Sequence, residues 1–311
     1  MRGTAAGFLV AGLLAVTATT AMAQSAAAAA GQSAGNASAP TAAASTAPAA
    51  QPSTEEPPAK RVTLTAGLDF VSAYMFRGIF QEDHGVIVPP FADVGVTAYS
   101  GEGALKSVTL NGGIWNSLHS GPSGSGNPDR SAWYEADYYG SVTFQVGGWK
   151  PGALFTSYTS PNDAFATVHE LAGVLAYDDS GSAFPLNPKA IVAFELKGQA
   201  DGGANKGTYF EFGVRPVVPL VDHPKYPFTL AIPAKLGLSL KDYYEGPTGS
   251  NKFGYFDLGG IASVPLAFMN GKSTWEVHGG VDFLWLGDNL KLLNGGDGVK
   301  PVASIGVSVI Y

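Results

Sequence analysis

The chain of 311 residues contains no cysteine and no uninterrupted apolar run of 18 residues. Without cysteine, neither a disulfide framework nor a Cys-ligated metal can stabilise the protein. A bundle of membrane-spanning helices is excluded, because each such helix needs about 20 apolar residues. Acidic residues outnumber basic ones by 25 to 18, and no basic stripe is present, which argues against nucleic acid as a partner.

The N-terminal part of the chain shows two segments that precede the main domain. Arg2, the apolar run 5–16 and the sequence Ala21-Met22-Ala23 predict a secretory signal over residues 1–23. Residues 24–60 are almost wholly Ala, Ser, Thr, Pro, Gly and Gln, which predicts a disordered tether because too little apolar surface can be buried. Residues 61–311 then form one domain, of a size that is normal for a single all-β barrel.

The composition of the main domain favours β structure. The chain has 41 Gly, 17 Phe and 13 Tyr and no long helical pattern. Alternating segments predict twelve strands, at about residues 62–74, 89–99, 106–117, 132–146, 151–159, 165–177, 188–198, 207–217, 227–242, 252–267, 274–286 and 300–311. An even number of antiparallel strands returns both ends of the domain to the same side.

Alternation of side chains within these segments separates two faces. From Val62 to Phe70, apolar residues alternate with small or polar ones, including Asp69. Near the C-terminus, Ile305 lies on the apolar face and Ser304 on the polar face, and the chain stops on Tyr311. A water-soluble β-sandwich with its polar face outward would show the same period, so alternation alone leaves both folds open.

Strand length and aromatic residues favour a membrane barrel over a sandwich. Predicted strands of about 10 to 13 residues exceed the usual soluble length and suit a tilted crossing of the bilayer. Aromatic residues gather at predicted strand ends, where interfacial girdles are expected: Phe70, Tyr74, Phe76, Trp133, Tyr134, Trp149, Tyr158, Tyr177, Tyr226, Phe228, Phe253, Trp275, Trp285 and Tyr311. We therefore predict an all-β, transmembrane antiparallel β-barrel of about twelve strands in the outer membrane of a Gram-negative bacterium, with the tether in the periplasm.

Pro233 falls in the middle of the ninth predicted strand. A proline cannot donate a hydrogen bond to the sheet, and a closed barrel has no free edge where this would be harmless. We expect a bulge at Pro233 or a different strand boundary.

The face opposite the large apolar residues carries most of the charges. The residues expected to line the lumen are Asp69, Glu135, Asp137, Glu170, Glu195, Glu211, Asp257, Glu276 and Asp282, against the basic residues Lys197, Arg215 and Lys235. This bias predicts a narrow, porin-like channel that admits small solutes or cations, because like charges in a low-dielectric wall concentrate counter-ions. The alternative is a non-conducting structural barrel whose interior is filled by ion pairs and tyrosines.

Two further side chains bear on function. Arg77 follows the first strand, where it either folds back over the mouth to pair with a lumen acid such as Glu135 or stays in a solvated loop. Ser117 and His119 lie at the outer end of the third strand, which leaves an outer-membrane esterase as an unfavoured alternative. The five histidines show no metal-ligand spacing, and His169 and Glu170 point to opposite faces. We therefore assign no catalytic, cofactor-binding or metal-binding residue and expect no enzymatic activity.

The most distinctive string is Phe70-Val71-Ser72-Ala73-Tyr74-Met75-Phe76-Arg77-Gly78. It resembles the F-V-S-x-Y-x-F-R-G motif of proteobacterial conserved hypothetical proteins of the Gcw_chp or TorF-like type, and the likeness covers about residues 62–180. The motif positions are Phe70, Ser72, Tyr74, Phe76, Arg77 and Gly78. This resemblance implies an outer-membrane barrel of unsettled activity. The terminal Tyr311 also resembles the C-terminal assembly signal of outer-membrane proteins, which implies contact with outer-membrane lipid and with the barrel-assembly machinery.

Overall fold

The structure of the protein is a computed structural model that describes residues 61–221, 223, 227–247, 249–266 and 273–311. The secretory signal predicted over residues 1–23 and the tether predicted over residues 24–60 lie outside the described residues. Tyr226, one of the aromatic residues expected at a strand end, also lies outside them.

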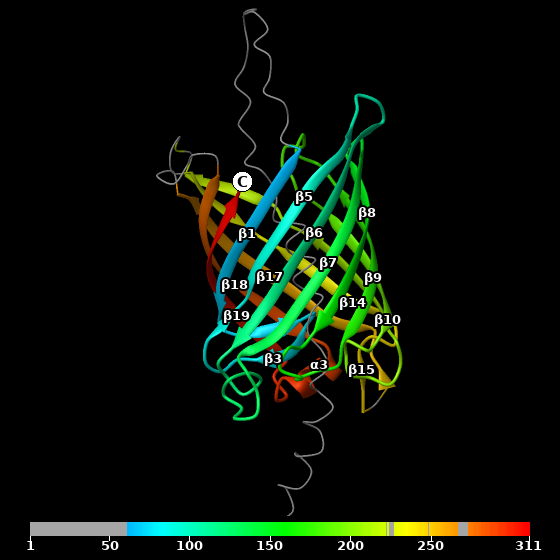
Figure 1. The fold of residues 1–311 in the computed structure, drawn as a ribbon, viewed down its shortest axis with the longest axis vertical. Coiled ribbons are helices and arrows are strands. Elements are labelled where there is room, and N and C mark those ends of the chain that lie inside the picture. The colour runs from blue at the N-terminus through cyan, green and yellow to red at the C-terminus, as the bar shows by residue number, and fades with distance from the viewer. Residues whose placement is uncertain (1–60, 222, 224–226, 248, 267–272) are drawn as a thin grey trace, which may run out of the picture.

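The described residues form a closed barrel of twelve long antiparallel strands, which are strongly tilted in Figure 1. In order around the barrel they are β1 (Val62–Val71), β5 (Pro90–Ser100), β6 (Leu105–His119), β7 (Trp133–Val146), β8 (Trp149–Thr159), β9 (Val168–Tyr177), β10 (Lys189–Lys197), β11 (Thr208–Val214), β14 (Ala234–Lys241), β17 (Phe253–Pro265), β18 (Thr274–Leu286) and β19 (Val299–Ile310). β19 closes the barrel against β1, with Ile305 opposite Phe70. The twelve-stranded barrel is therefore confirmed, and a sandwich of two stacked sheets is wrong.

Two prolines interrupt neighbouring strands at the same height. β11 continues beyond Pro216 as β12 (Val217–Val221), and β13 (Phe228–Ala231) continues beyond Pro233 as β14. The carbonyl oxygens of both prolines still accept hydrogen bonds, Pro216 from the N–H of Ile232 at 2.9 Å and Pro233 from the N–H of Gly259 at 2.8 Å. The strand boundary between β13 and β14 confirms the irregularity expected at Pro233. The two prolines lack an N–H group, and they lie where the hydrogen-bond ladder is interrupted.

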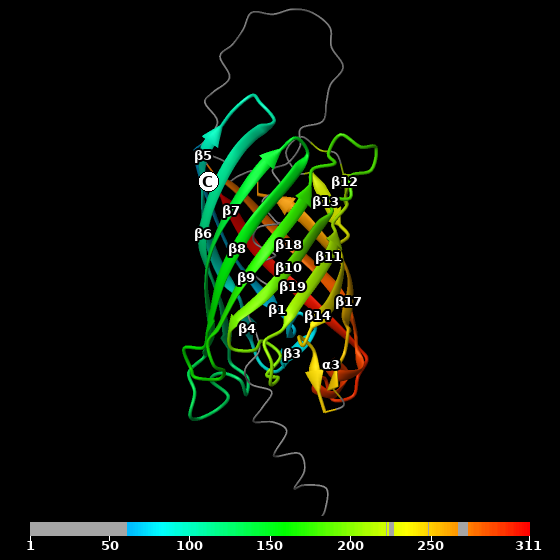
Figure 2. The ribbon, with the colours of Figure 1, turned by 90° about the vertical axis from the view of Figure 1, so that its right-hand side faces the viewer.

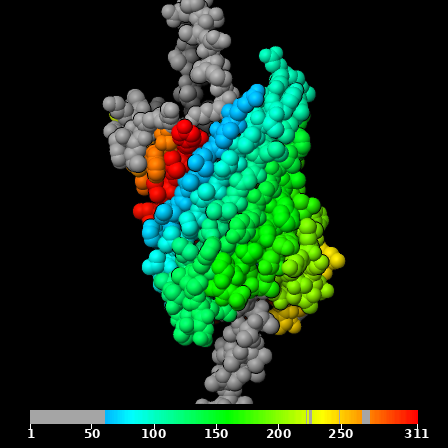
Figure 3. All heavy atoms as spheres, viewed as in Figure 1, coloured from blue at the N-terminus to red at the C-terminus, as the bar shows by residue number. Residues whose placement is uncertain are grey.

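Large apolar side chains point away from the barrel along its wall. Leu68, Ile114, Phe155, Leu171 and Ile305, from five different strands, are between 36 and 59% exposed. The aromatic residues exposed near strand ends include Trp133, Trp149, Tyr177, Trp285 and Tyr311. Figure 3 shows the outer face of β1, β5, β6, β7 and β8 as a continuous surface. Among the described residues, no helix is long and apolar enough to cross a membrane.

Four aromatic residues expected at an outer rim lie inside the barrel instead. Tyr74, Phe76, Tyr134 and Tyr158 are all buried. Tyr134 turns inward because it is the extra residue of a β-bulge, where Trp133 pairs with Leu118 and the register then shifts. Tyr74 and Phe76 lie inside because the chain after β1 does not continue along the wall.

One end of the barrel carries the short elements. They are β2 (Tyr74–Phe76), β3 (Ile79–Glu82), β4 (Ile87–Val88), β15 (Glu245–Gly246), β16 (Gly249–Ser250) and α3 (Asp288–Leu293). β3 and α3 lie at this end in Figures 1 and 2, whereas the C-terminus lies at the other. β2 and β3 pair only with each other in the sheet assignment and form a hairpin, which we call the plug hairpin (residues 74–82).

Candidate functional site

The plug hairpin enters the barrel directly after β1. Ser72 still belongs to the wall, because its N–H donates to the carbonyl of Ala303 and its Oγ accepts from the N–H of Ala303, both at 2.9 Å. Two residues later the chain has left the sheet, and Phe76 and Ile79 are almost completely buried, with exposures of 0 and 1%. The motif F-V-S-x-Y-x-F-R-G thus spans the end of a wall strand, the departure point and the tip of the plug hairpin.

A two-residue turn forms the tip of the plug hairpin. Phe76 pairs with Ile79, and the turn residues Arg77 and Gly78 both have positive φ angles, 46° and 81°. Positive φ at both positions is the pattern of a type I′ turn, in which Asn, Asp and Gly are preferred. A Cβ atom at Gly78 would also lie 2.8 Å from Cδ1 of Leu290. Glycine is therefore required here for both conformation and space.

The guanidinium group of Arg77 is bound by side chains of the barrel. It donates two hydrogen bonds to the carboxylate of Glu170, both at 2.8 Å, and a third to the hydroxyl of Tyr243 at 2.6 Å. Its central carbon lies 3.9 Å from the centre of the Tyr209 ring. Bidentate pairing with a carboxylate is stronger than a neutral hydrogen bond, and the planar guanidinium group also stacks on aromatic faces.

The prediction that Arg77 folds back to pair with a lumen acid is confirmed, but the acid is Glu170 and not Glu135. The hydroxyl of Tyr74, near the base of the hairpin, donates to Glu135 at 3.1 Å. The tip reaches further across the mouth, to β9. The plug hairpin therefore extends through the interior at this end, from the β6 and β7 side of the barrel to β9 and β11.

We define the guanidinium site as Glu170, Tyr158, Tyr209 and Tyr243. Alternation brings Tyr158 of β8, Glu170 of β9 and Tyr209 of β11 to the inner face, and Tyr243 follows β14. Of these four residues, the sequence predicts only Glu170 as an interior side chain. Tyr209 carries the same signal, because it shares the inner face with Glu211. Tyr243 lies in a connection, where no periodicity indicates direction.

The predicted lumen acids all face inward, in two groups. Near the plug hairpin, Glu135, Asp137, Glu170 and Glu195 are buried. Further along the barrel, Asp257 pairs with Lys235 at 2.8 Å, and Asp69 is 2.6 Å from Nε2 of His278. In the same region Glu211 accepts hydrogen bonds from the hydroxyls of Tyr209 and Tyr255, and Glu276 and Asp282 interact electrostatically with Arg215.

The set of interior bases differs from the predicted one. Lys197 is exposed, because the register of β10 shifts between Glu195 and Lys197 and turns it outward. Lys189, which shares the face of Glu195, points inward and interacts with Glu211. Together with Arg77, it reduces the predicted excess of acidic side chains.

Ser117 and His119 are hydrogen-bonded rather than merely adjacent. Ser117 Oγ lies 2.6 Å from His119 Nε2, and His119 Nδ1 lies 2.6 Å from Ser123 Oγ. Since the Ser123 hydroxyl donates to Glu82 at 2.9 Å, His119 donates from Nδ1 and accepts from Ser117. This order is that of a serine–histidine catalytic relay. However, Ser117 and His119 are 0% exposed, so no ester at a lipid rim could reach them in this conformation.

Glu82 anchors the plug hairpin to the connection that follows β6. Its carboxylate accepts hydrogen bonds from the N–H groups of Asp83, His84 and Ser123 and from the Ser123 hydroxyl, at 2.8 to 3.0 Å. Burial alone raises the pKa of Glu82, but these donors outweigh it and hold the pKa below its usual range.

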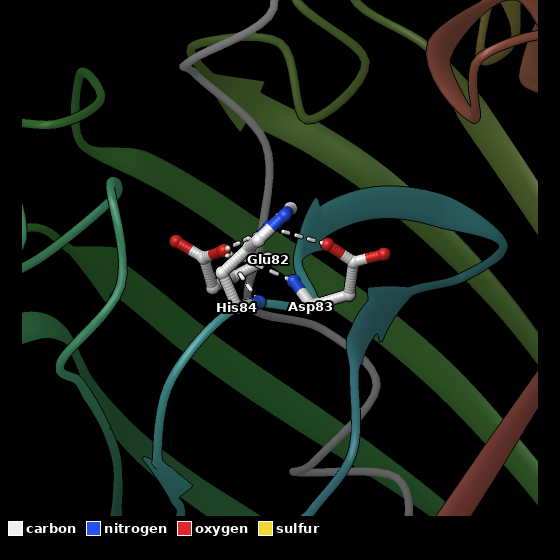
Figure 4. A group of neighbouring side chains, drawn as sticks. All are labelled: Glu82, Asp83 and His84. Atoms are coloured by element: carbon white, nitrogen blue, oxygen red, sulfur yellow. Dashed lines mark hydrogen bonds and ion pairs between the residues drawn. The ribbon is translucent and has the colours of Figure 1, made fainter.

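Glu82, Asp83 and His84 are the one group of potential metal ligands found in the described residues (Figure 4). Their ligand atoms lie within 4.8 Å of one another. The oxygens of Glu82 already accept four hydrogen bonds, and Asp83 forms an ion pair with Lys300 at 2.6 Å. We therefore interpret this cluster as a structural contact that links the end of the plug hairpin to Lys300 of β19.

A pH-dependent contact holds the connection that carries Tyr243. Asp201, between β10 and β11, accepts hydrogen bonds from the N–H groups of Gly203 and Glu245, at 2.8 and 2.7 Å. Burial raises the pKa of Asp201 from 3.8 to about 6. Because burial favours the neutral carboxyl group more than the two N–H donors favour the carboxylate, Asp201 stabilises this region most below about pH 4, and that stability is lost as the pH rises through about 6.

We expect the hydrogen-exchange protection factor of the Glu245 amide to fall between pH 4 and pH 7. The variant Asp201→Asn stays neutral throughout, so its protection factor should not change over the same interval. An equal fall in the two proteins would show that another group titrates.

The chain was compared with protein-family models, with curated proteins and with solved structures. No protein-family model and no curated protein matches it, so the resemblance to the Gcw_chp or TorF-like proteins stays a prediction. An outer membrane channel from Pseudomonas putida F1 matches with 8% identity and a TM-score of 0.43, over 80% of this chain and 94% of that chain. The NanC porin matches with 13% identity and a TM-score of 0.37, over 79% of this chain and 98% of that chain. The translocator domain of the autotransporter NalP from Neisseria meningitidis matches with 13% identity and a TM-score of 0.35, over 82% and 90%. At this identity and TM-score, these likenesses assign neither a family nor an activity.

Proposed function

We propose that the protein is an outer-membrane β-barrel with a narrow passage for small solutes or cations, closed at one mouth by the plug hairpin. The observation that carries this proposal is the division of the wall: large apolar side chains are exposed outside, and charged side chains face the interior. A closed sheet with this division satisfies every backbone group in lipid, whereas a soluble protein rarely exposes so many apolar side chains.

The proposed orientation is supported by the positions of the ends of the barrel. Residues 64 and 311 are hydrogen-bonded to each other, so the start of β1 and the C-terminus lie at the same end, opposite to the plug hairpin. If the predicted tether lies in the periplasm, the plug hairpin closes the mouth that faces the outside of the cell. Contact with the barrel-assembly machinery through Tyr311 belongs to the same proposal.

Cations are favoured because acidic side chains follow the interior beyond the plug hairpin. Asp69, Glu211, Glu276 and Asp282 are all only partly buried there. Carboxylates in a low-dielectric wall attract counter-ions, and salt screens this attraction.

A non-conducting structural barrel is the second candidate. The complete burial of Phe76, together with the ion pair of Arg77 across the mouth, favours a permanent closure. In that case the interior charges would serve only the stability of the barrel.

Planar-bilayer conductance separates the two candidates. Tyr74 pairs with Glu82, so a short Gly-Ser linker can replace residues 74–82 without moving the wall. We expect small, infrequent current steps from the wild-type protein and larger, frequent, cation-selective steps from this variant, because the obstruction is gone.

A control variant replaces residues 180–186, in the connection at the opposite end, by the same linker and should behave like the wild type. All three proteins must first show a heat-dependent gel shift, which establishes that the barrel has folded. If the hairpin-free barrel is folded and silent, the passage is wrong and the structural barrel stands.

A further inference from the structure

The residue at the tip of the plug hairpin is not the one that the turn prefers. Arg77 occupies the first central position of a turn with positive φ, where an arginine is strained and Asn, Asp or Gly is not. Strain of this kind persists where the surrounding contacts outweigh it. Here those contacts are made by the guanidinium group with the guanidinium site, together with the hydrogen bond that the Tyr244 hydroxyl donates to the backbone carbonyl of Arg77 at 3.0 Å.

The guanidinium site is ordered by contacts within the barrel. The hydroxyl of Tyr158 donates to Oε1 of Glu170 at 3.1 Å, which fixes the plane of the carboxylate. The hydroxyl of Tyr209 donates to Glu211 at 2.7 Å, which fixes the ring that stacks on Arg77. These two hydrogen bonds do not involve the plug hairpin, so they do not depend on its presence.

The chemistry of the site selects one class of cation. A carboxylate that accepts two parallel N–H bonds fits a planar guanidinium, and an aromatic face at 3.9 Å accepts the flat side of the same group. An ammonium group or a metal ion offers neither two coplanar donors nor a flat face. Urea has the plane but not the charge.

We propose that the guanidinium site, Glu170 with Tyr158, Tyr209 and Tyr243, is a binding site for solutes that carry a guanidinium group, and that Arg77 fills it in the closed barrel. As a statement about solutes in the passage, this rests on the proposed function. Binding at the site itself does not require conduction. A guanidinium-bearing solute that reaches the site competes with Arg77 and favours release of the plug hairpin.

The first test uses the variant Arg77→Ala, folded in detergent micelles, with guanidinium chloride, urea or sodium chloride at millimolar concentration. We expect guanidinium to raise the temperature of the heat-dependent gel shift in a saturable manner, and urea and sodium to leave it unchanged. The double variant Arg77→Ala/Glu170→Gln should bind guanidinium at least about 30-fold more weakly, because the charged partner is lost.

Lys235→Ala is the matched control, because it also removes one interior cation from a buried carboxylate, Asp257. If Lys235→Ala responds to guanidinium as strongly as Arg77→Ala does, the effect is one of general charge and the proposal fails. It fails equally if Arg77→Ala shows no selective response.

The second test uses the wild-type protein, so that the proposal stays testable should Arg77→Ala not fold. Arginine should lower the hydrogen-exchange protection of the amides of the plug hairpin, and citrulline, its uncharged analogue, should not. Equal protection with the two amino acids overturns the proposal. Neither test reads a current: selective binding without conductance would refute the proposed passage alone, and conductance without selective binding would refute the guanidinium site alone.

Discussion

Replacing Arg77 by methionine should lower the free energy of unfolding by about 3–5 kcal/mol, because it leaves the carboxylate of Glu170 buried without its partner. The side chains of Arg77 and Glu170 are only 4% and 3% exposed, so water cannot substitute for the lost contacts. Methionine keeps much of the length and apolar contact of arginine. The measurement is urea-induced unfolding in lipid vesicles, followed by tryptophan fluorescence.

Two control variants show whether the cost comes from breaking the buried ion pair or from removing a basic side chain in general. Lys150→Met breaks the ion pair with Asp178, whose side chains are 39% and 35% exposed, and should cost no more than about 1 kcal/mol. The double variant Arg77→Met/Glu170→Met removes both charges and should be less destabilised than Arg77→Met alone. If Arg77→Met proves no more costly than Lys150→Met, the ion pair does not hold the plug hairpin in the barrel.

The wall of the barrel could be predicted from the sequence because its pattern is local. Each strand repeats with a period of two residues, so Asp69 and Phe70 reveal their opposite faces without knowledge of any distant residue. The same logic placed Glu170 inward and His169 outward. It failed where the period itself changes, at the bulge before Glu135 and at the register shift before Lys197.

The plug hairpin could not be predicted in this way. Arg77 is bound by Glu170, 93 residues away, and by Tyr243, 166 residues away, and neither separation leaves a trace in the local pattern. The string from Phe70 to Gly78 is distinctive in the sequence, yet its aromatic residues fit an outer rim as well as an interior. What decides between them is the set of inward partners, which only the closed barrel brings together.

These two kinds of prediction bear on different parts of the function. The local pattern predicts a wall with one apolar and one polar face, and the closure of the sheet between β1 and β19 makes the apolar face the outer one, as in a membrane barrel. The long-range contacts of Arg77 hold the plug hairpin against the inside of the barrel, and the proposed closure of the passage depends on them. A barrel with the same wall and a glycine in place of Arg77 would keep the acidic interior but would lose the ion pair that holds its mouth closed.

Two substitutions on the outer face of β19 test whether lipid surrounds the barrel. Ile305 lies in the middle of this strand with its side chain 59% exposed, and Val299 lies at the beginning of the same strand and is 43% exposed. In a bilayer, Ile305→Arg should cost about 2–4 kcal/mol and Val299→Arg about 0–1 kcal/mol, because the cost of a charge falls from the midplane toward the interface. Urea-induced unfolding in lipid vesicles measures both.

The two positions are well matched, because both lie on the same face of β19 with exposed side chains. They therefore differ mainly in their expected depth in the bilayer. For a protein whose exterior contacts water, an arginine at either position would be solvated, and both substitutions would lie within about 0.5 kcal/mol of the wild type. Equal and small effects would therefore contradict an outer-membrane location even though the barrel remained folded. A large cost confined to Ile305 would require an apolar layer around the middle of the barrel, and lipid is the surrounding that supplies one.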